Sequence, residues 1–496
     1  MLASLISATV LGVDGQLVTV EVHISSGLPS YQVVGLPDAA VRESRERVRA
    51  ALLSSELPWP RNRVTINLAP GGVRKTGAGL DLAVAVGIQI ACSSLSADAL
   101  ENTAVLGELG LDGTVRHVPG LLALVHAVVQ FGCTRVIVPP ADAAEAALIP
   151  NVEVLIANNL SQLHRALKGE IAWPDVPAPT EVVNAEDDPI DLAEVRGLAW
   201  ARRALEVSAA GGHHLLLTGP PGAGKTMLAR RISTILPRLT DSEALEVTRV
   251  HSVAGRAPGA LVRRPPFRSP HHTASVAAIV GGGSGRPTPG EVTLAHNGYL
   301  FLDELGEFAP RALEALRQPL EERQVWIARQ LHTLCFPADF VLVACSNPCP
   351  CGLGAPACSC TEASRARYRR RLSAPLLDRF DLRLAVRAPE PTDGAGESSA
   401  DVAARVDDAV KRQLDRLDGT RWRRNSHIPA GAAEHFLPLS SDAREAWNIE
   451  IESRLLTGRG AARIRQVART LADLEDQAEI EPTHIAWAAL LREDVP

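Results

Sequence analysis

Gly219-Pro220-Pro221-Gly222-Ala223-Gly224-Lys225-Thr226 is the stretch of this 496-residue chain that decides its fold. A short apolar run precedes it at residues 214–218, and a helical pattern follows it over 226–236. A glycine-rich loop between a buried strand and a helix surrounds phosphate groups with backbone amides and a helix N-terminus. We therefore predict an α/β core that binds ATP, with Lys225 on the β and γ phosphates and Thr226 on Mg²⁺. A chance glycine-rich turn is the alternative, which the strand and the helix on either side disfavour.

Two further apolar strands run into polar residues. Asp303 and Glu304 follow one strand, and Asn347 follows the other. Ligands of α/β sheets bind where parallel strands end, and phosphoryl transfer needs a positioned water and neutralised charge. We predict that Asp303 holds the magnesium, that Glu304 polarises the attacking water, and that Asn347 orients water or senses the γ phosphate. The alternatives are a solvated strand end for the two carboxylates and a turn before Pro348 for the amide.

Two arginines downstream are candidates for contact with the nucleotide. Arg379 lies among acidic and apolar residues on an expected surface segment. In an oligomeric ATPase such an arginine can reach the γ phosphate of a neighbouring subunit and stabilise the transition state; half of an ion pair is the alternative. Arg459 opens a helix near the C-terminus, where it could reach the nucleotide from a lid or lie solvated at a helix start.

The composition is that of a globular protein of several domains. Apolar residues make up 46% of the chain, which is enough for several cores. The net charge of −6 gives no global positive field for nucleic acid, although a ring can enclose a basic channel. No apolar run approaches the ~20 residues that cross a bilayer, and the N-terminus lacks the basic leader of a signal peptide. We predict a cytoplasmic protein with no membrane partner.

The alternation of strands, helices and linkers divides the chain. Residues 1–168 alternate strand-like and helical runs, as a self-contained α+β domain does. The proline-containing, acidic stretch 169–190 has no apolar period and is expected to be a linker. We predict the ATPase domain at 191–388 and, after a second stretch of low hydrophobicity, a helical domain at 400–496.

Four of the eight cysteines cluster on one expected loop: Cys349, Cys351, Cys358 and Cys360. A reducing cytoplasm disfavours disulfides, whereas four thiolates can bind Zn²⁺ tetrahedrally. We predict structural zinc, with an iron–sulfur cluster and free thiols as the alternatives. Just downstream, the arginines of residues 365–371 surround Tyr368. They form either a solvated helix face or a contact to nucleic acid or a neighbouring subunit.

Read together, these motifs resemble those of the AAA+ ATPases of the magnesium-chelatase branch, and in particular the ComM/YifB group of chelatase-like proteins. The segments that carry the resemblance are Arg264-Pro-Pro-Phe-Arg268-Ser-Pro-His271-His272-Thr273, Gly281-Gly-Gly283, Pro289-Gly-Glu291 and the stretch from Pro319 to Arg329. It spans essentially the whole chain. It implies a ring, most simply a homo-hexamer, with Arg379 as an arginine finger and Arg459 as a second sensor. Arg463 is the alternative for the sensor.

The resemblance also implies insertions that line a central pore. The candidates are residues 275–289 and the hairpin-like stretch 324–337, which has Arg329 and Gln330 between its strands. A basic tip would grip DNA phosphates independently of sequence, whereas an ordinary surface hairpin is the alternative. Adjacent histidines seldom chelate one ion, so we expect His271 and His272 to have a structural or DNA-proximal role.

The first domain resembles the Lon-protease-like domain, an α+β fold of the ribosomal S5 domain 2 type, through residues 71–85 and 107–121. In proteolytic relatives these segments carry a nucleophilic serine and an activating lysine. Gly77 and Leu124 stand at those positions here. We therefore predict no peptide hydrolysis, and instead a platform that stabilises a ring or contacts DNA.

The resemblance finally implies a function: an ATP-driven motor on single-stranded or branched DNA, of branch-migration or helicase type, in recombination or natural transformation. Two alternatives remain open. One is a chelatase-type motor subunit that drives metal insertion through a partner, and the other is an ATPase that remodels proteins. The fused Lon-like domain and the four-cysteine loop favour the DNA motor, because they match the ComM/YifB arrangement.

Overall fold

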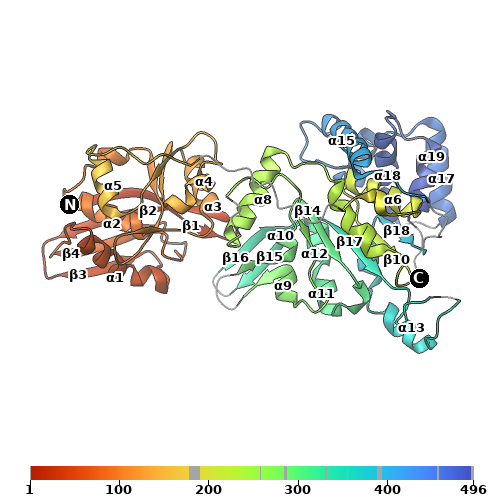
Figure 1. Ribbon diagram of the computed structural model, residues 1–496, viewed down its shortest axis with the longest axis horizontal. Helices are drawn as coiled ribbons and strands as arrows, with labels where there is room; N and C mark the ends of the chain where they lie inside the picture. Colours follow the sequence, from red (N-terminus) through yellow and green to blue (C-terminus); the bar gives the residue numbers. More distant parts are fainter. Residues whose placement is uncertain are drawn as a thin grey trace. The chain divides into compact units, whose positions relative to one another are not determined.

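The computed structural model describes residues 2–177, 190–256, 259–283, 287–329, 332–354, 356–387, 394–454 and 457–492. The chain forms two compact units (Figure 1). Unit 1 comprises Met1–Asn184 and Asp241–Val262, and unit 2 comprises Ala185–Thr240 and Arg263–Pro496. Among the described residues, none of the helices combines the length and apolar character that crossing a bilayer requires.

Unit 1 is built on a seven-stranded sheet in the order β3-β4-β2-β1-β5-β8-β9. Its centre is the antiparallel hairpin of β1 (Leu2–Leu11) and β2 (Asp14–Ser25). The remaining strands are β3 (Ser30–Val34), β4 (Arg63–Ala69), β5 (Thr103–Val105), β8 (Arg135–Val138) and β9 (Glu153–Ile156), with a separate small hairpin of β6 (Glu108–Leu109) and β7 (Val115–Arg116). Strand β5 pairs in parallel with β1, and β8 and β9 continue in the same direction. The mixed sheet matches the predicted α+β character of this part of the chain.

The helices of unit 1 are α1 (Ala39–Ser54), α2 (Asp81–Ala91), α3 (Leu121–Gln130), α4 (Ala143–Ala146) and α5 (Leu160–Leu167). Helices α2 and α3 pack on the β1–β2 hairpin and are buried along most of their length. Leu124 lies inside this layer at 1% exposure. Gly77 lies in the loop before α2 with a φ of +82°, which favours glycine. Neither residue type can serve as a nucleophile or a base.

Helix α8 (Asp241–Val253) belongs to unit 1, although the chain reaches it only after the glycine-rich loop. It packs on α3 with Ala244, Val247 and Val250 buried. Its Arg249 forms an ion pair of 3.2 Å with Asp14 at the turn of the β1–β2 hairpin. The predicted ATPase segment 191–388 therefore contains one element that completes the other unit.

Unit 2 is built on a five-stranded parallel sheet in the order β11-β14-β17-β10-β18. The strands are β11 (Phe267–Arg268), β14 (Gly298–Leu302), β17 (Phe340–Ser346), β10 (Leu215–Thr218) and β18 (Leu382–Ala385). Strands β10, β14 and β17 are buried along their whole length, as strands covered on both faces by helices are. The helices of this part are α6 (Ala199–Gly211), α7 (Lys225–Arg230), α9 (Val276–Val280), α10 (Glu291–Leu294), α11 (Pro310–Ala315), α12 (Arg317–Glu322), α13 (Glu362–Arg369) and α14 (Ala374–Leu377). This sheet confirms the predicted α/β core.

Two hairpins project from unit 2 at the predicted insertions. Strands β12 (Gly281–Gly282) and β13 (Thr288–Pro289) form one, and β15 (Gln324–Arg329) and β16 (His332–Pro337) form the other. The two lie against each other, because a Cβ added to Gly281 would meet Ile327 Cδ1 at 3.1 Å. The side chain of Arg329 and all of Gln330 lie outside the described residues, as do residues 284–286.

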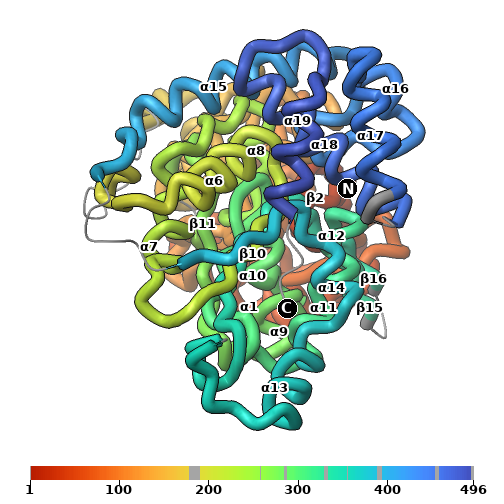
Figure 2. The backbone as a smooth tube through the Cα atoms, turned by 90° about the vertical axis from the view of Figure 1, so that its right-hand side faces the viewer, coloured from red at the N-terminus to blue at the C-terminus, as the bar shows by residue number. Residues whose placement is uncertain are grey.

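The C-terminal part of unit 2 is helical, as predicted, and is drawn in blue in Figure 2. It contains α15 (Ser399–Arg416), α16 (Ala433–Phe436), α17 (Ser441–Arg454), α18 (Gly458–Leu474) and α19 (Pro482–Leu490). Its helices share one apolar core with the sheet, to which Leu215, Val406 and Leu471 all contribute.

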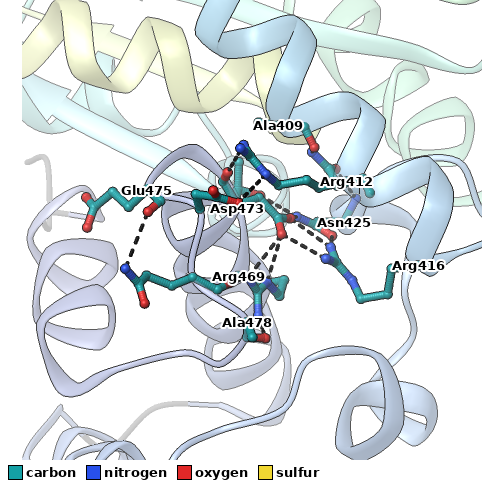
Figure 3. Close-up of polar contacts among 12 residues, drawn as sticks. Ala409, Arg412, Arg416, Asn425, Arg469, Asp473, Glu475 and Ala478 are labelled. Carbon is teal, nitrogen blue, oxygen red and sulfur yellow. Dashed lines mark hydrogen bonds and ion pairs between the residues drawn. The ribbon is translucent and has the colours of Figure 1, made fainter.

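A buried carboxylate ties these helices together (Figure 3). Asp473, 1% exposed, accepts two hydrogen bonds of 2.8 and 2.7 Å from the guanidinium of Arg416 on α15. It also accepts one of 3.1 Å from Arg469 and one of 2.8 Å from Asn425. A buried charge needs such full pairing, so the network fixes α15 against α18.

Candidate nucleotide site

The glycine-rich loop joins the end of β10 to the start of α7, as the sequence predicts. Gly219 packs so closely that an added Cβ would lie 2.2 Å from the carbonyl oxygen of Val386, which excludes any larger residue. Gly224 adopts a φ of +82° at the N-cap of α7, a conformation that favours glycine. These constraints turn the loop backbone toward the carboxyl edge of the sheet, where parallel α/β sheets bind ligands.

A cavity of about 400 Å³ lies at this edge. Its lining includes nine predicted site residues: Pro221, Gly222, Ala223, Gly224, Lys225, Thr226, Asp303, Glu304 and Asn347. Met227, Cys345 and Ser346 also line it; Met227 follows Thr226, and Cys345 and Ser346 are the last two residues of β17 before Asn347. Gly219 and Pro220 instead contact the site through Lys225, to which both offer a carbonyl acceptor.

Lys225 is 8% exposed and contributes a positively charged side chain to the lining of the cavity. Its Nζ donates hydrogen bonds to the carbonyl oxygens of Gly219 (2.7 Å) and Pro220 (2.9 Å) and to Asn347 Oδ1 (3.3 Å). Burial lowers the pKa of Lys225 from its ordinary value. The bond to Asn347 joins the ends of β10 and β17, so an ammonium and an amide face the same space.

Thr226 and Asp303 form the oxygen-donor pair. Thr226 Oγ1 donates a hydrogen bond of 2.9 Å to Asp303 Oδ2, and Asp303 Oδ1 accepts one of 2.9 Å from the backbone amide of Glu304. A hydroxyl and a carboxylate at this separation are the hard ligands that Mg²⁺ takes from proteins. The pair therefore fits the predicted magnesium site.

Glu304 follows the aspartate in a left-handed backbone conformation, with φ +52° and ψ +49°. This conformation is uncommon for a residue other than glycine and recurs at functional sites, where the surrounding structure maintains it. The side chain is 55% exposed and lines the cavity. A carboxylate in that position is able to accept a proton from water.

The predicted nucleotide arginines do not line the cavity. Arg379 is 4% exposed and donates to Glu321 Oε2 at 2.7 Å. Arg459 donates to Glu321 Oε1 at 2.8 Å, so one carboxylate holds both arginines. Arg463 is bonded to Asp381 and to the carbonyl oxygen of Arg379, and burial lowers its pKa to about 10.

The four clustered cysteines follow Asn347 directly and converge. Their sulfur atoms all lie within 4.8 Å of one another, with Cys349–Cys351, Cys349–Cys358 and Cys351–Cys358 separations of 3.2, 3.5 and 3.8 Å. A tetrahedral zinc with bonds of about 2.3 Å would separate its sulfur ligands by about 3.8 Å. The backbone amides of Gly354 and Cys351 lie within hydrogen-bond distance of Cys349 Sγ and Cys360 Sγ. The donor set therefore fits a four-thiolate metal site.

The thiols of this cluster have strongly different proton affinities. The pKa of Cys351 is lowered to about 5, first because the backbone amide of Leu353 donates to its sulfur. The pKa of Cys360 is raised to about 12 by desolvation and by the neighbouring thiols. Four crowded sulfurs cannot all ionise by themselves, whereas a bound cation would favour the thiolate at each.

Tyr368, which the sequence places among five arginines, points inward and is 7% exposed. A Cβ on Gly306 would lie 2.3 Å from its hydroxyl, and Arg371 donates to the Gly306 carbonyl at 2.8 Å. Burial raises the pKa of Tyr368. The aromatic ring is therefore part of the support beneath the Asp303-Glu304 turn, not a surface on which a base can stack.

A parallel sheet in the order β11-β14-β17-β10-β18, with a phosphate loop, an Asp-Glu pair and an Asn at the ends of adjacent strands, defines a P-loop protein of the AAA+ class. Comparison with protein families agrees with this class, because three magnesium-chelatase models match successive segments of the chain. Residues 191–393 match the model described as "Magnesium chelatase, subunit ChlI", residues 20–142 match "Subunit ChlI of Mg-chelatase", and residues 396–492 match "Magnesium chelatase, subunit ChlI C-terminal".

The similarity to curated relatives is full length. An uncharacterized protein of Mycobacterium tuberculosis is 43% identical over 496 residues, covering 98% of both chains. The uncharacterized protein YifB of Escherichia coli is 41% identical over 489 residues, covering 97% of this chain and 95% of that one. The competence protein ComM of Haemophilus influenzae is 38% identical over 502 residues, covering 98% and 96%. The chain belongs to the ComM/YifB family of magnesium-chelatase-like AAA+ proteins.

A shorter similarity concerns the Lon-like fold. Lon protease 2 of Bacillus subtilis is 27% identical over 193 residues, which are 34% of this chain and 35% of that one. This match confirms the predicted Lon-protease-like character of the fold.

Proposed function

We propose that this protein is a magnesium-dependent ATPase that converts hydrolysis into movement on DNA. The observation that carries the ATPase part is the cavity that unites Lys225, Thr226, Asp303, Glu304 and Asn347. These side chains come from the ends of three adjacent strands, and together they are the groups that phosphoryl transfer requires.

Each side chain has a distinct part in this proposal. Lys225 holds the β and γ phosphates, while Thr226 Oγ1 and an Asp303 carboxylate oxygen would hold magnesium, which when bound neutralises phosphate charge. Glu304 accepts a proton from the attacking water, and Asn347 orients that water against the γ phosphate. Catalysis thus depends mainly on positioning and electrostatics rather than on covalent chemistry.

We propose Arg379 as the arginine finger that reaches the γ phosphate of a neighbouring subunit in a homo-hexameric ring, and Arg459 as the second sensor that contacts the nucleotide from the helical lid. Neither arginine lines the cavity of its own chain, and Glu321 binds both. Each would therefore leave Glu321 when it contacts the nucleotide.

The proposed substrate is single-stranded or branched DNA. The protein moves along it in the cytoplasm and so drives branch migration or helicase action. One support is the name of the Haemophilus influenzae relative, a competence protein. Another is the β15–β16 hairpin, which stands at the predicted pore insertion and carries Trp326 at 48% exposure. Exposed aromatic rings on such hairpins can stack on bases without regard to sequence.

The four-cysteine cluster is proposed to hold structural zinc. Its thiolates would fix the loop that follows Asn347, and the loop reaches the phosphate loop itself. A Cβ on Gly352 would meet Pro221 Cδ at 2.8 Å, so the two loops are in contact. When bound, zinc supplies four bonds that fold this segment and no redox chemistry.

The test is steady-state ATP hydrolysis by the full chain with and without single-stranded or forked DNA. We expect DNA to stimulate hydrolysis and the protein to displace or migrate strands only with ATP. Lys225→Ala, which loses the phosphate contact, is the control for contaminating activity. Hydrolysis that DNA does not stimulate, without strand displacement, would contradict the DNA motor and favour a chelatase-type or protein-remodelling ATPase.

A further inference from the structure

His272 lies beside the cavity, and the sequence motifs did not connect it to catalysis. Strand β11 lies parallel to β14, with Phe267 opposite Tyr299 and Arg268 opposite Leu300. Both strands end at the same edge of the sheet, so the residues after β11 meet the residues after β14. His272 Nδ1 lies 3.4 Å from Glu304 Oε2 as a result.

The imidazole is held on two sides. The ring of Phe308, itself 1% exposed, packs edge-on at a centroid distance of 6.4 Å, and the ring of His271 lies against the imidazole at 4.1 Å, tilted by 34°. His271 makes its own hydrogen bond, between its Nδ1 and Thr273 Oγ1 at 2.8 Å. The position of the His272 ring is thus set by packing from residues other than Glu304.

The Glu304 carboxylate lacks comparable support. Its backbone amide is fixed on Asp303 Oδ1, but the side chain is 55% exposed. Within the described ranges, His272 is the basic side chain at ion-pair distance from this carboxylate. Long side chains without a partner sample several rotamers, and a general base works only in the one that faces its proton.

We propose that His272 is the positioning residue for Glu304. Its Nδ1 holds one carboxylate oxygen from outside the cavity, which leaves the other oxygen to receive a proton from the attacking water. This is the usual arrangement in which a base is itself oriented by a third group. The inference rests on the proposed function, since it needs Glu304 to be the base.

The test compares three variants in the full-length protein by steady-state ATPase kinetics and equilibrium nucleotide binding. We expect His272→Ala to lower kcat by on the order of tenfold, with KM and nucleotide affinity unchanged within about twofold. His272→Asn, whose Nδ2 occupies the place of Nδ1, should recover part of the loss. His435→Ala removes an exposed histidine of α16 whose ring contacts Phe436 instead, and its kcat should stay within about threefold of the unaltered protein.

A double variant tests whether His272 acts through the Glu304 carboxylate. In a Glu304→Gln background, His272→Ala should cause no further fall in kcat, because the carboxylate through which it acts is gone. A full additional fall would overturn the inference, as would a single His272→Ala variant with unchanged kcat. If Glu304→Gln alone hydrolyses ATP at the original rate, the proposed base is wrong instead.

Discussion

At the scale of single residues, metal analysis tests directly whether the four clustered cysteines bind zinc. Protein purified without chelators should contain about one zinc per chain by elemental analysis, because four converging thiolates bind it tightly. The double variant Cys351→Ser with Cys358→Ser should lose it. The control variant Cys92→Ser, which replaces a free cysteine of unit 1, should retain the zinc. A folded, active chain that contains neither zinc nor iron would contradict the assignment.

The residues of the cavity were predictable because each belongs to, or directly follows, a recognisable sequence pattern. Lys225 and Thr226 end a fixed loop pattern, and Asp303 ends an unmistakable apolar strand. Arg379 differs, since no pattern in the chain shows that Glu321 would hold it at 4% exposure. His272 stood in a segment that carries the family resemblance, but the sequence led us to expect a structural or DNA-proximal role for it. Its contact with Glu304 depends on the pairing of β11 with β14, which no local sequence feature indicates.

At the scale of elements, the buried Asp473 network should decide the stability of the helical part of unit 2. Asp473→Ala leaves Arg469, 1% exposed, and Arg416 without their carboxylate, so we expect unfolding to become easier by about 3 kcal/mol. Urea denaturation followed by tryptophan fluorescence measures this, because Trp422 and Trp447 pack against that core.

Asp408→Ala is the matched control for this measurement. Asp408 on α15 is 59% exposed and pairs with Lys411 at 3.0 Å on the surface, so its loss should cost less than about 1 kcal/mol. Equal effects of the two substitutions would show that the network in Figure 3 does not hold the helices.

The elements themselves followed the sequence patterns where those patterns were long. The second strand of the β1–β2 hairpin alternates apolar and polar residues, the buried strands of unit 2 are continuous apolar runs, and helix α18 has apolar residues at three- and four-residue spacing. Short elements escaped prediction: β11 has two residues, and it is placed by pairing with β14 rather than by its own propensity. Helix α8 has an ordinary helical pattern, but only its contacts show which unit it joins.

At the scale of the whole molecule, the chain passes between the units more than once. Residues 241–262 leave the nucleotide-binding unit to complete the Lon-like one. A truncation that removes only the N-terminal residues would separate α3 from α8 and expose Ala244, Val247 and Val250. A deletion that tests the Lon-like unit as a ring or DNA platform must therefore remove or replace α8 as well.

Whether the cavity binds ATP and hydrolyses it with Glu304 as the base is tested most directly by measuring ATP binding and ATP turnover side by side for Glu304→Gln and Lys225→Ala. Glu304→Gln should bind ATP with near-original affinity yet lose hydrolysis by on the order of a hundredfold or more, because only the proton acceptor is gone. Lys225→Ala should lose binding and hydrolysis together. Turnover by Glu304→Gln at the original rate would contradict the account.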